Sequence, residues 1–181
     1  MYKNYIKRLL DIVFSLLLII ILSPLILVTF LIILIHLGRP VFDIRFPREG
    51  KNKKPFYMLK FRTRVYDTGT MWGRKTKLSH VIDKLRLNEL PQLFNVLVGD
   101  MSLVGPRAFI CGEKLPNDTI SKKRYLVKPG VTGLFQVSKV KKTHKEKLKC
   151  DIYYYDHLSF ILDLRIIIKT PLYIIKKIIT K

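Results

Sequence analysis

The chain has 181 residues, 34 of them Lys or Arg and 13 Asp or Glu, so its formal net charge is +21, and 49% of its residues are hydrophobic. This length suits one domain with a real core and is too short for two. A purely nucleic-acid-binding protein would explain the charge but not the long apolar segment near the start, so no nucleic-acid partner is expected. An anionic membrane surface explains both features, because Lys and Arg near acidic headgroups each gain roughly 1 kcal/mol.

Residues 12–35 are almost wholly apolar and are interrupted only by Ser15, Ser23, Pro24 and Thr29. The segment is longer than the roughly 20 residues that cross a bilayer, and it lacks the short apolar region and cleavage site of a signal peptide. Proline removes a helix hydrogen bond, so Ser23-Pro24 predicts a kink or a break. Both flanks are basic, and a single span would leave one of them on the wrong face of the membrane. The sequence therefore favours a re-entrant helix hairpin, broken at Ser23-Pro24 and held among membrane lipids, over a kinked single span.

Asp11 lies at the mouth of this apolar segment. Helical spacing would allow its carboxylate to pair with Lys7 or Arg8. A solvated charge at the membrane interface is the alternative, and the sequence leaves the two open.

The region after Gly38 mixes polar and apolar residues. Short strands are expected at Val41–Phe46 and Phe56–Phe61, and the glycines and polar residues of Arg64–Lys77 predict a loop. Near the end of the chain, Leu158–Ile179 combines Ile and Leu runs with basic residues and is interrupted at Thr170-Pro171. Basic apolar helices of this kind lie well in a membrane interface, with a core helix followed by a solvated tail as the alternative.

A helix is expected from about Leu90 to Leu97, because leucine and phenylalanine recur there at i, i+3, i+4 and i+7. Pro91 suits its first turn, where a missing N–H costs little. Asn88 would then be the N-cap and Glu89 would stand at the helix start. The positive end of the helix dipole favours acidic groups and bound phosphate at that place.

Three ungapped stretches carry a resemblance to a known family. They are Lys60–Thr63 (KFRT), Asn88–Leu97 (NELPQLFNVL) continuing to Gly99–Arg107 (GDMSLVGPR), and Pro129–Val137 (PGVTGLFQV). In this order, behind a membrane segment broken at Ser-Pro, they resemble the monotopic phosphoglycosyl transferases of the bacterial sugar transferase family. The resemblance covers essentially the whole chain.

The resemblance implies an enzyme that moves a sugar 1-phosphate from a nucleotide-activated sugar, usually a UDP-sugar, to polyprenyl phosphate. The reaction opens glycan assembly at the cytoplasmic face of the bacterial inner membrane. In the family the aspartate of an Asp-Glu pair attacks phosphorus to form a covalent phosphosugar intermediate, and the glutamate helps to bind Mg²⁺. These positions are Asn88 and Glu89 here.

Phosphoryl transfer depends chiefly on positioning and on neutralising charge, so Lys60, Arg62 and Arg107 in the matching motifs are expected to contact phosphates. Pro129-Gly130 and Thr132-Gly133 supply turns in which a backbone can approach a ligand closely, and purely structural turns are the alternative. The expected architecture is α/β and mostly helical. It comprises a re-entrant membrane helix at 1–38, a small cytosolic catalytic domain at 39–157, and basic amphipathic helices at the interface at 158–181.

The chain departs from the family where the chemistry would occur. Asn88 replaces the aspartate, and a carboxamide is a poor nucleophile compared with a carboxylate. Asp83 stands where the family commonly has arginine, which removes a phosphate partner. On a continuous helix five residues turn roughly 140°, so Asp83 is not expected to replace the missing carboxylate.

The sequence therefore predicts a phosphoglycosyl transferase. A catalytically impaired homologue that acts as a membrane-bound lipid-phosphate-binding or scaffold protein is the alternative. A homodimer, in which a second chain supplies missing groups, is left open, and so are the sugar, the nucleotide and the length of the polyprenyl carrier.

Overall fold

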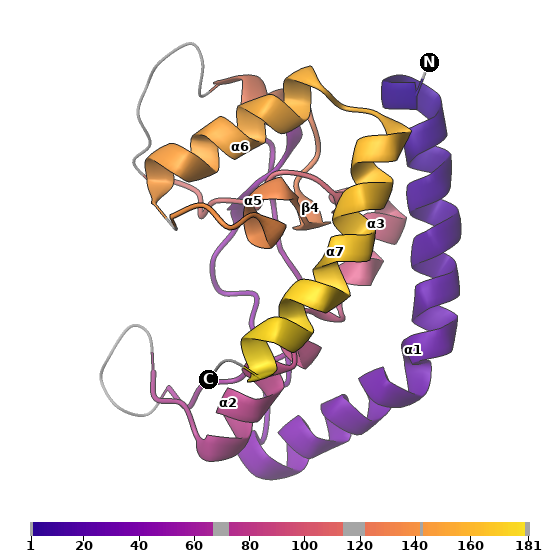
Figure 1. Cartoon of the computed structure of the whole chain (residues 1–181). Coiled ribbons are helices and arrows are strands. Elements are labelled where there is room, and N and C mark those ends of the chain that lie inside the picture. Colours follow the sequence, from indigo (N-terminus) through magenta and orange to yellow (C-terminus); the bar gives the residue numbers. More distant parts are fainter. Residues whose placement is uncertain (1, 67–72, 114–121, 142, 180–181) are drawn as a thin grey trace.

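The computed structural model describes residues 2–66, 73–113, 122–141 and 143–179 (Figure 1). Its helices are α1 (Lys7–Leu37), α2 (Lys77–Lys84), α3 (Gln92–Val98), α5 (Leu134–Val137), α6 (His144–Asp156) and α7 (Phe160–Ile179). A π-helical turn precedes α1 at Tyr2–Ile6, and 3₁₀ turns lie at Lys51–Lys53, Leu87–Glu89 and Lys123–Leu126. The prediction of a mostly helical chain with a small sheet region is confirmed.

Two small sheets complete the described fold. Strand β1 (Arg48–Glu49) pairs antiparallel with β2 (Pro55–Phe56), so that Arg48 faces Phe56. Strand β3 (Ser102–Val104) pairs in parallel with β4 (Gly130–Thr132), so that Ser102 faces Gly130.

The predicted strands at Val41–Phe46 and Phe56–Phe61 are wrong as continuous strands. The two segments run side by side, but they share only an isolated antiparallel bridge between Phe42 and Phe61. The reason lies in α3, where the buried Asn95 side chain accepts from the Leu59 N–H at 2.8 Å and donates to the Tyr57 carbonyl at 2.9 Å. An asparagine side chain thus takes backbone groups that a neighbouring strand would otherwise bind.

The predicted loop Arg64–Lys77 lies partly outside the described residues. Residues 64–66 and 73–76 contain no helix or strand, but Val65 and Arg74 form an isolated antiparallel bridge. Helix α2 begins directly afterwards, and the Thr76 side chain caps it by accepting from the Ser79 N–H at 3.1 Å.

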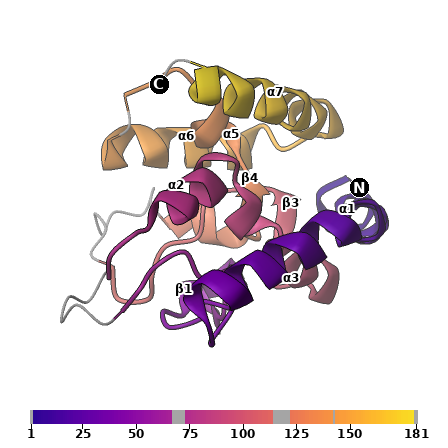
Figure 2. The same cartoon turned by 90° about the horizontal axis from the view of Figure 1, so that it is seen from below.

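Helix α1 passes through Ser23-Pro24 without interruption, so of the predicted kink or break the structure shows a kink, at which the helix bends without ending (Figures 1 and 2). The Ser23 hydroxyl donates to the Ile20 carbonyl at 2.8 Å. That carbonyl is four residues before Pro24, and proline has no N–H to offer it. The serine therefore satisfies the acceptor that the proline leaves, and the helix continues past it.

Helix α1 is also the helix of the described chain whose length and composition would allow it to cross a membrane. Large apolar side chains are exposed along it, including Ile20 at 61% and Ile21 at 69%. Exposed apolar surface on this scale is typical of a helix in contact with lipid.

Both interpretations of Asp11 are wrong. The carboxylate is buried and accepts from the Ser102 hydroxyl and from the Leu103 N–H, each at 3.0 Å, so it joins α1 to β3. Lys7 instead pairs with Asp163 of α7 at 2.6 Å. Arg8 donates to the carbonyls of Val96 and Leu97 at 2.6 and 2.8 Å, where it satisfies free acceptors at the C-terminal end of α3.

Helix α7 is continuous across Thr170-Pro171, so the predicted interruption is also wrong. Asp163 and Ile166 of this helix are buried, and Ile166 packs with Val104, Val127 and Tyr154 in one of the apolar clusters of the core. Other apolar side chains of α7 are exposed, among them Ile168, Leu172 and Ile175. The helix therefore contributes one face to the core and presents apolar side chains outward.

Candidate functional site

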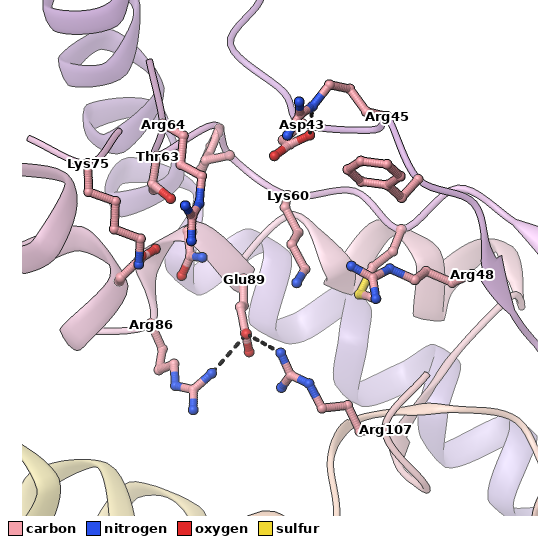
Figure 3. A pocket seen from close by; sticks show the side chains of 15 residues that line it. Asp43, Arg45, Arg48, Lys60, Thr63, Arg64, Lys75, Arg86, Glu89 and Arg107 are labelled. Carbon is pink, nitrogen blue, oxygen red and sulfur yellow. Dashed lines mark hydrogen bonds and ion pairs between the residues drawn. The ribbon is translucent and has the colours of Figure 1, made fainter. Parts of the chain in front are cut away.

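A cavity of about 410 Å³ lies between the segment that follows α1, helix α2, the turn Leu87–Glu89 and Arg107 (Figure 3). Its lining holds seven cationic side chains and three carboxylates: Arg45, Arg48, Lys60, Arg64, Lys75, Arg86 and Arg107, with Asp43, Asp83 and Glu89. Asn88 lines the same cavity. A concave site with this excess of positive charge suits a ligand that carries several phosphate charges.

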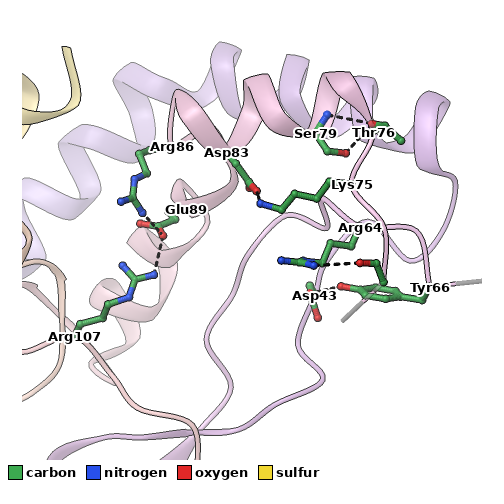
Figure 4. Close-up of polar contacts among 11 residues, drawn as sticks. Asp43, Arg64, Tyr66, Lys75, Thr76, Ser79, Asp83, Arg86, Glu89 and Arg107 are labelled. Atoms are coloured by element: carbon green, nitrogen blue, oxygen red, sulfur yellow. Dashed lines mark hydrogen bonds and ion pairs between the residues drawn. The ribbon is translucent and has the colours of Figure 1, made fainter. Parts of the chain in front are cut away.

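Glu89 lies between two guanidinium groups (Figures 3 and 4). Its Oε1 accepts from Arg86 Nη1 at 2.9 Å and from Arg107 Nη2 at 3.1 Å. Burial raises the pKa of this carboxyl, but the charges of Arg107, Arg86 and Lys60 outweigh burial and lower the pKa from 4.5 to about 2. Glu89 is therefore ionised and holds both arginines toward the cavity.

Lys60 points into the cavity from the segment that Asn95 fixes (Figure 3). Burial, followed by the neighbouring charge of Arg107, lowers the pKa of Lys60 from 10.5 to about 8. The ammonium group is still mostly charged at neutral pH. It is a cation with little water around it, which strengthens its attraction for an anionic ligand.

Arg107 is positioned by a close crossing of two backbones. A Cβ atom on Gly130 would lie 2.1 Å from the Gly105 nitrogen, and one on Gly105 would lie 2.4 Å from the Lys128 carbonyl oxygen. The glycines in Pro129–Val137 thus serve the close contact of this segment with Gly105, which supports the structural alternative for these turns. The Arg107 carbonyl accepts from Arg124 Nη2 at 2.7 Å, and Arg124 is itself held by the buried Asp151 at 3.0 Å.

Asn88 is not the N-cap of α3. It lies within the 3₁₀ turn Leu87–Glu89, and Pro91 precedes α3 without a side-chain cap. The chain reverses at Arg86, whose φ of 62° is in the left-handed region. That conformation is strained for a residue with a Cβ, and it ends the preceding helical path. The Asn88 Oδ1 atom is buried without a hydrogen-bond partner in the described part of the chain.

Asp83 lines the same cavity as Asn88 and Glu89, so the helical-wheel argument against it is wrong. Helix α2 ends at Lys84 and Arg86 is left-handed. Residues 83 to 88 therefore do not form the continuous helix, with its rotation of about 100° per residue, that the argument assumed. The Asp83 Oδ2 atom is ion-paired with Lys75 (Figure 4). Its Oδ1 atom is buried and has no hydrogen-bond partner among the described residues.

Arg62 does not line the cavity, which corrects its expected place at the phosphates. Its side chain is 7% exposed and donates to the Leu37 and Gly38 carbonyls at the end of α1. These groups have no partner within the helix, so Arg62 caps it. Lys60, Arg107, Asn88 and Glu89 are the predicted site residues that the fold brings together.

Sequence reasoning missed much of the lining. Arg45, Arg48, Arg64, Lys75 and Arg86 line the cavity but were not predicted. In a chain with 34 Lys and Arg, a single basic residue carries little information. The spacing of Arg86 three residues before Glu89 is the one local signal that could have indicated a pair.

The described residues contain no group of three or more His, Cys, Asp or Glu side chains able to hold a metal ion by themselves. The cavity nevertheless offers oxygen donors, because Asp83 Oδ1 and Asn88 Oδ1 have no partners there and both Glu89 contacts use Oε1. Mg²⁺ is commonly held by one or two carboxylates together with substrate phosphates and water. The donor set therefore fits a cation that binds together with a phosphorylated ligand.

Comparison with known protein families decides the family of this chain. Residues 2–177 match the family described as bacterial sugar transferase. The chain belongs to the bacterial sugar transferase family. Among its relatives in this family is the uncharacterized sugar transferase EpsL of Bacillus subtilis, which is 38% identical over 91% of this chain and 84% of that protein. The resemblance predicted from the three motifs is confirmed.

Two further bacterial sugar transferases carry names that state a reaction. The UDP-N-acetylgalactosamine-undecaprenyl-phosphate N-acetylgalactosaminephosphotransferase of Aeromonas hydrophila is 34% identical over 92% of this chain and 43% of its own length. The UDP-glucose:undecaprenyl-phosphate glucose-1-phosphate transferase of Xanthomonas campestris is 39% identical over 72% of this chain and 31% of its own length. The chain thus spans less than half of either enzyme.

Proposed function

We propose that this sugar transferase moves a sugar 1-phosphate from a UDP-sugar to polyprenyl phosphate and so initiates glycan assembly. The observation that carries the proposal is the cavity, which is lined by seven cationic side chains and three carboxylates within the residues that match the family. The reactions named for the Aeromonas and Xanthomonas relatives agree with a donor diphosphate and a polyprenyl phosphate acceptor.

In this proposal the donor diphosphate occupies the cavity and each described side chain has a simple task. Lys60 and Arg107 neutralise phosphate charge, and Arg86 adds a third cation close to them. Glu89 holds Arg86 and Arg107 in place by accepting from both. Fixed cations are effective here because phosphoryl transfer depends mainly on positioning and on charge neutralisation.

Mg²⁺ belongs to the proposal as a cofactor. Glu89 would hold it through Oε2, together with the free oxygen of Asn88 and the donor phosphates. The ion would supply charge neutralisation at the diphosphate.

The membrane arrangement is part of the same proposal. Helix α1, bent at Ser23-Pro24, would enter the lipid and return to the cytoplasmic face of the inner membrane, so that both basic flanks stay on one side. Helix α7 would lie at the interface with its exposed apolar side chains toward lipid. The lipid tail of the acceptor then remains in the bilayer while its phosphate reaches the cavity.

Asn88 favours a second candidate, a non-catalytic lipid-phosphate-binding or scaffold protein, since it replaces the expected nucleophile. The purified protein in lipid nanodiscs, supplied with polyprenyl phosphate, Mg²⁺ and a panel of UDP-sugars, would be assayed for UMP release beside Asn88→Asp. Turnover by the unaltered chain is expected. Turnover by Asn88→Asp alone would contradict the proposal and favour the second candidate. Lys149→Ala, at an exposed site on α6, serves as the surface control.

A further inference from the structure

The cavity carries three carboxylates, and two of them are occupied by other groups. Asp43 Oδ1 accepts from Arg45 at 3.1 Å and its Oδ2 from the Tyr66 hydroxyl at 2.5 Å. Glu89 is held by two guanidiniums, and their charges lower its pKa to about 2. A carboxylate stabilised this strongly is a weak nucleophile.

Asp83 differs from both of them. One oxygen, Oδ2, is paired with the Lys75 ammonium group, whereas Oδ1 is buried and has no hydrogen-bond partner in the described part of the chain. Burying an unpaired carboxylate oxygen costs free energy, and such groups in folded proteins often have a functional role. Lys75 fixes the side chain by one oxygen and leaves the other for a ligand (Figure 4).

The left-handed conformation of Arg86 brings Asp83 to the same cavity as Asn88. Asp83 precedes the reversal and Asn88 follows it, and both line one cavity. Asn88 brings a neutral amide to the cavity lining, and Asp83 brings a carboxylate to the same lining. The cavity thus holds a carboxylate at position 83 as well as the amide at position 88, and each has a buried oxygen without a partner among the described residues.

From these contacts we propose that Asp83 is the nucleophile of this sugar transferase. The inference rests on the proposed function. The Oδ1 atom attacks the phosphorus that bears the sugar, and an O–P bond forms between the carboxylate and that phosphorus. The bond from phosphorus to the bridging oxygen of the diphosphate breaks, and UMP leaves with the electron pair. Polyprenyl phosphate then attacks the same phosphorus through its own oxygen, and the Asp83 carboxylate leaves unchanged.

Lys75 has a positioning role in this scheme. Its ammonium group holds Oδ2 and directs Oδ1 to the cavity, and it offsets the charge that builds up when an anion attacks a phosphate. A purely structural role for the pair is the competing explanation, in which the pair only ties residue 75 to α2.

The test uses the full-length protein in nanodiscs with a UDP-sugar and Mg²⁺ but without polyprenyl phosphate. The unaltered chain should release about one UMP per protein in a burst, and peptide mapping by mass spectrometry should find a sugar phosphate on the peptide that contains Asp83. Asp83→Asn should lose the burst and the adduct and lower turnover by at least about 10³-fold. Asp156→Asn, a carboxylate on the exposed end of α6, is the matched control and should keep both signals.

A second experiment separates chemistry from folding. The double variant Asp83→Asn/Asn88→Asp moves the carboxylate to the family position and should regain turnover that Asp83→Asn lacks. Full turnover by Asp83→Asn, or an adduct on any other residue of the unaltered chain, would overturn the role of Asp83 while leaving the proposed function in place. Absence of UMP release from the unaltered chain with every donor would overturn both. Because the adduct is mapped on the unaltered chain, the inference remains testable even if Asp83→Asn does not fold.

Discussion

The pKa of the Glu89 carboxyl is lowered to about 2, and two guanidinium groups donate to its Oε1 atom. A carboxyl whose pKa is lower in the folded than in the unfolded state stabilises the fold above its unfolded pKa. That contribution is lost as the pH falls toward the folded pKa. The same contact that orders Arg86 and Arg107 for a ligand therefore makes the fold sensitive to acid.

We expect the free energy of unfolding to fall between about pH 4.5 and pH 2 because Glu89 takes up a proton in this range on unfolding. A tenfold change in proton affinity is worth about 1.4 kcal/mol, so the loss due to Glu89 is roughly 3 kcal/mol. Denaturant unfolding of the unaltered chain and of Glu89→Gln across this range measures it as the difference between the two curves. Glu146→Gln, at a half-buried carboxylate on α6, is the control, and a Glu89→Gln curve parallel to the unaltered one would refute the expectation.

Lys60 leads to a prediction at high pH, and it concerns ligand affinity instead of stability. With a pKa of about 8, it loses its charge as the pH rises from 7 to 9, and the affinity for UMP should fall by up to about tenfold. Calorimetric titration with UMP at both pH values measures this. Lys60→Arg remains charged and should show little pH dependence, whereas a steep decline in that variant would assign the effect to another group.

At the scale of the elements, α1 shows how a helix continues past a proline. Pro24 deprives the Ile20 carbonyl of its helix partner, and the Ser23 hydroxyl replaces it at 2.8 Å. The helix thereby bends without ending. The sequence correctly located this irregularity but not its form, because whether a proline breaks or bends a helix depends on which group takes up the freed carbonyl.

Pro24→Ala should straighten α1, since alanine restores an N–H for the Ile20 carbonyl. Single cysteines at positions 5 and 39, with Cys111 and Cys150 replaced by serine, report the side of the membrane on which each flank lies. In intact spheroplasts neither cysteine should react with a membrane-impermeant maleimide, and Pro24→Ala should make one flank reactive. Labelling of position 39 without the Pro24 change would contradict the re-entrant arrangement.

At the scale of the whole molecule, Asp163 connects the N-terminal segment with α6 and with the start of α7. Its Oδ2 accepts from Lys7 and from the Tyr2 hydroxyl, each at 2.6 Å, and its Oδ1 from the Tyr154 hydroxyl at 2.7 Å. The start of α1, helix α6 and helix α7 therefore meet at one buried carboxylate. Figure 1 shows the start of α1 beside the start of α7.

Asp163→Asn should lower the free energy of unfolding by about 3–5 kcal/mol, because it leaves Lys7, whose side chain is only 12% exposed, without a counter-charge. Thermal unfolding in detergent measures the change. The exposed pair of Lys123 and Asp156 provides the comparison, and Asp156→Asn should cost less than about 1 kcal/mol. Equal losses in the two variants would mean that Asp163 does not connect these helices.

Sequence by itself determined the family, the apolar N-terminal helix with its irregularity at Ser23-Pro24, and the convergence of Lys60, Asn88, Glu89 and Arg107. Contiguous motifs and hydrophobic length are local properties that can be read along a chain. Tertiary structure alone decided that Asp11 is a buried acceptor, that Arg62 caps α1, and that Asp83 shares the cavity with Asn88. These outcomes depend on a left-handed turn at Arg86 and on hydrogen bonds between distant segments, and neither has a periodic signal in the sequence.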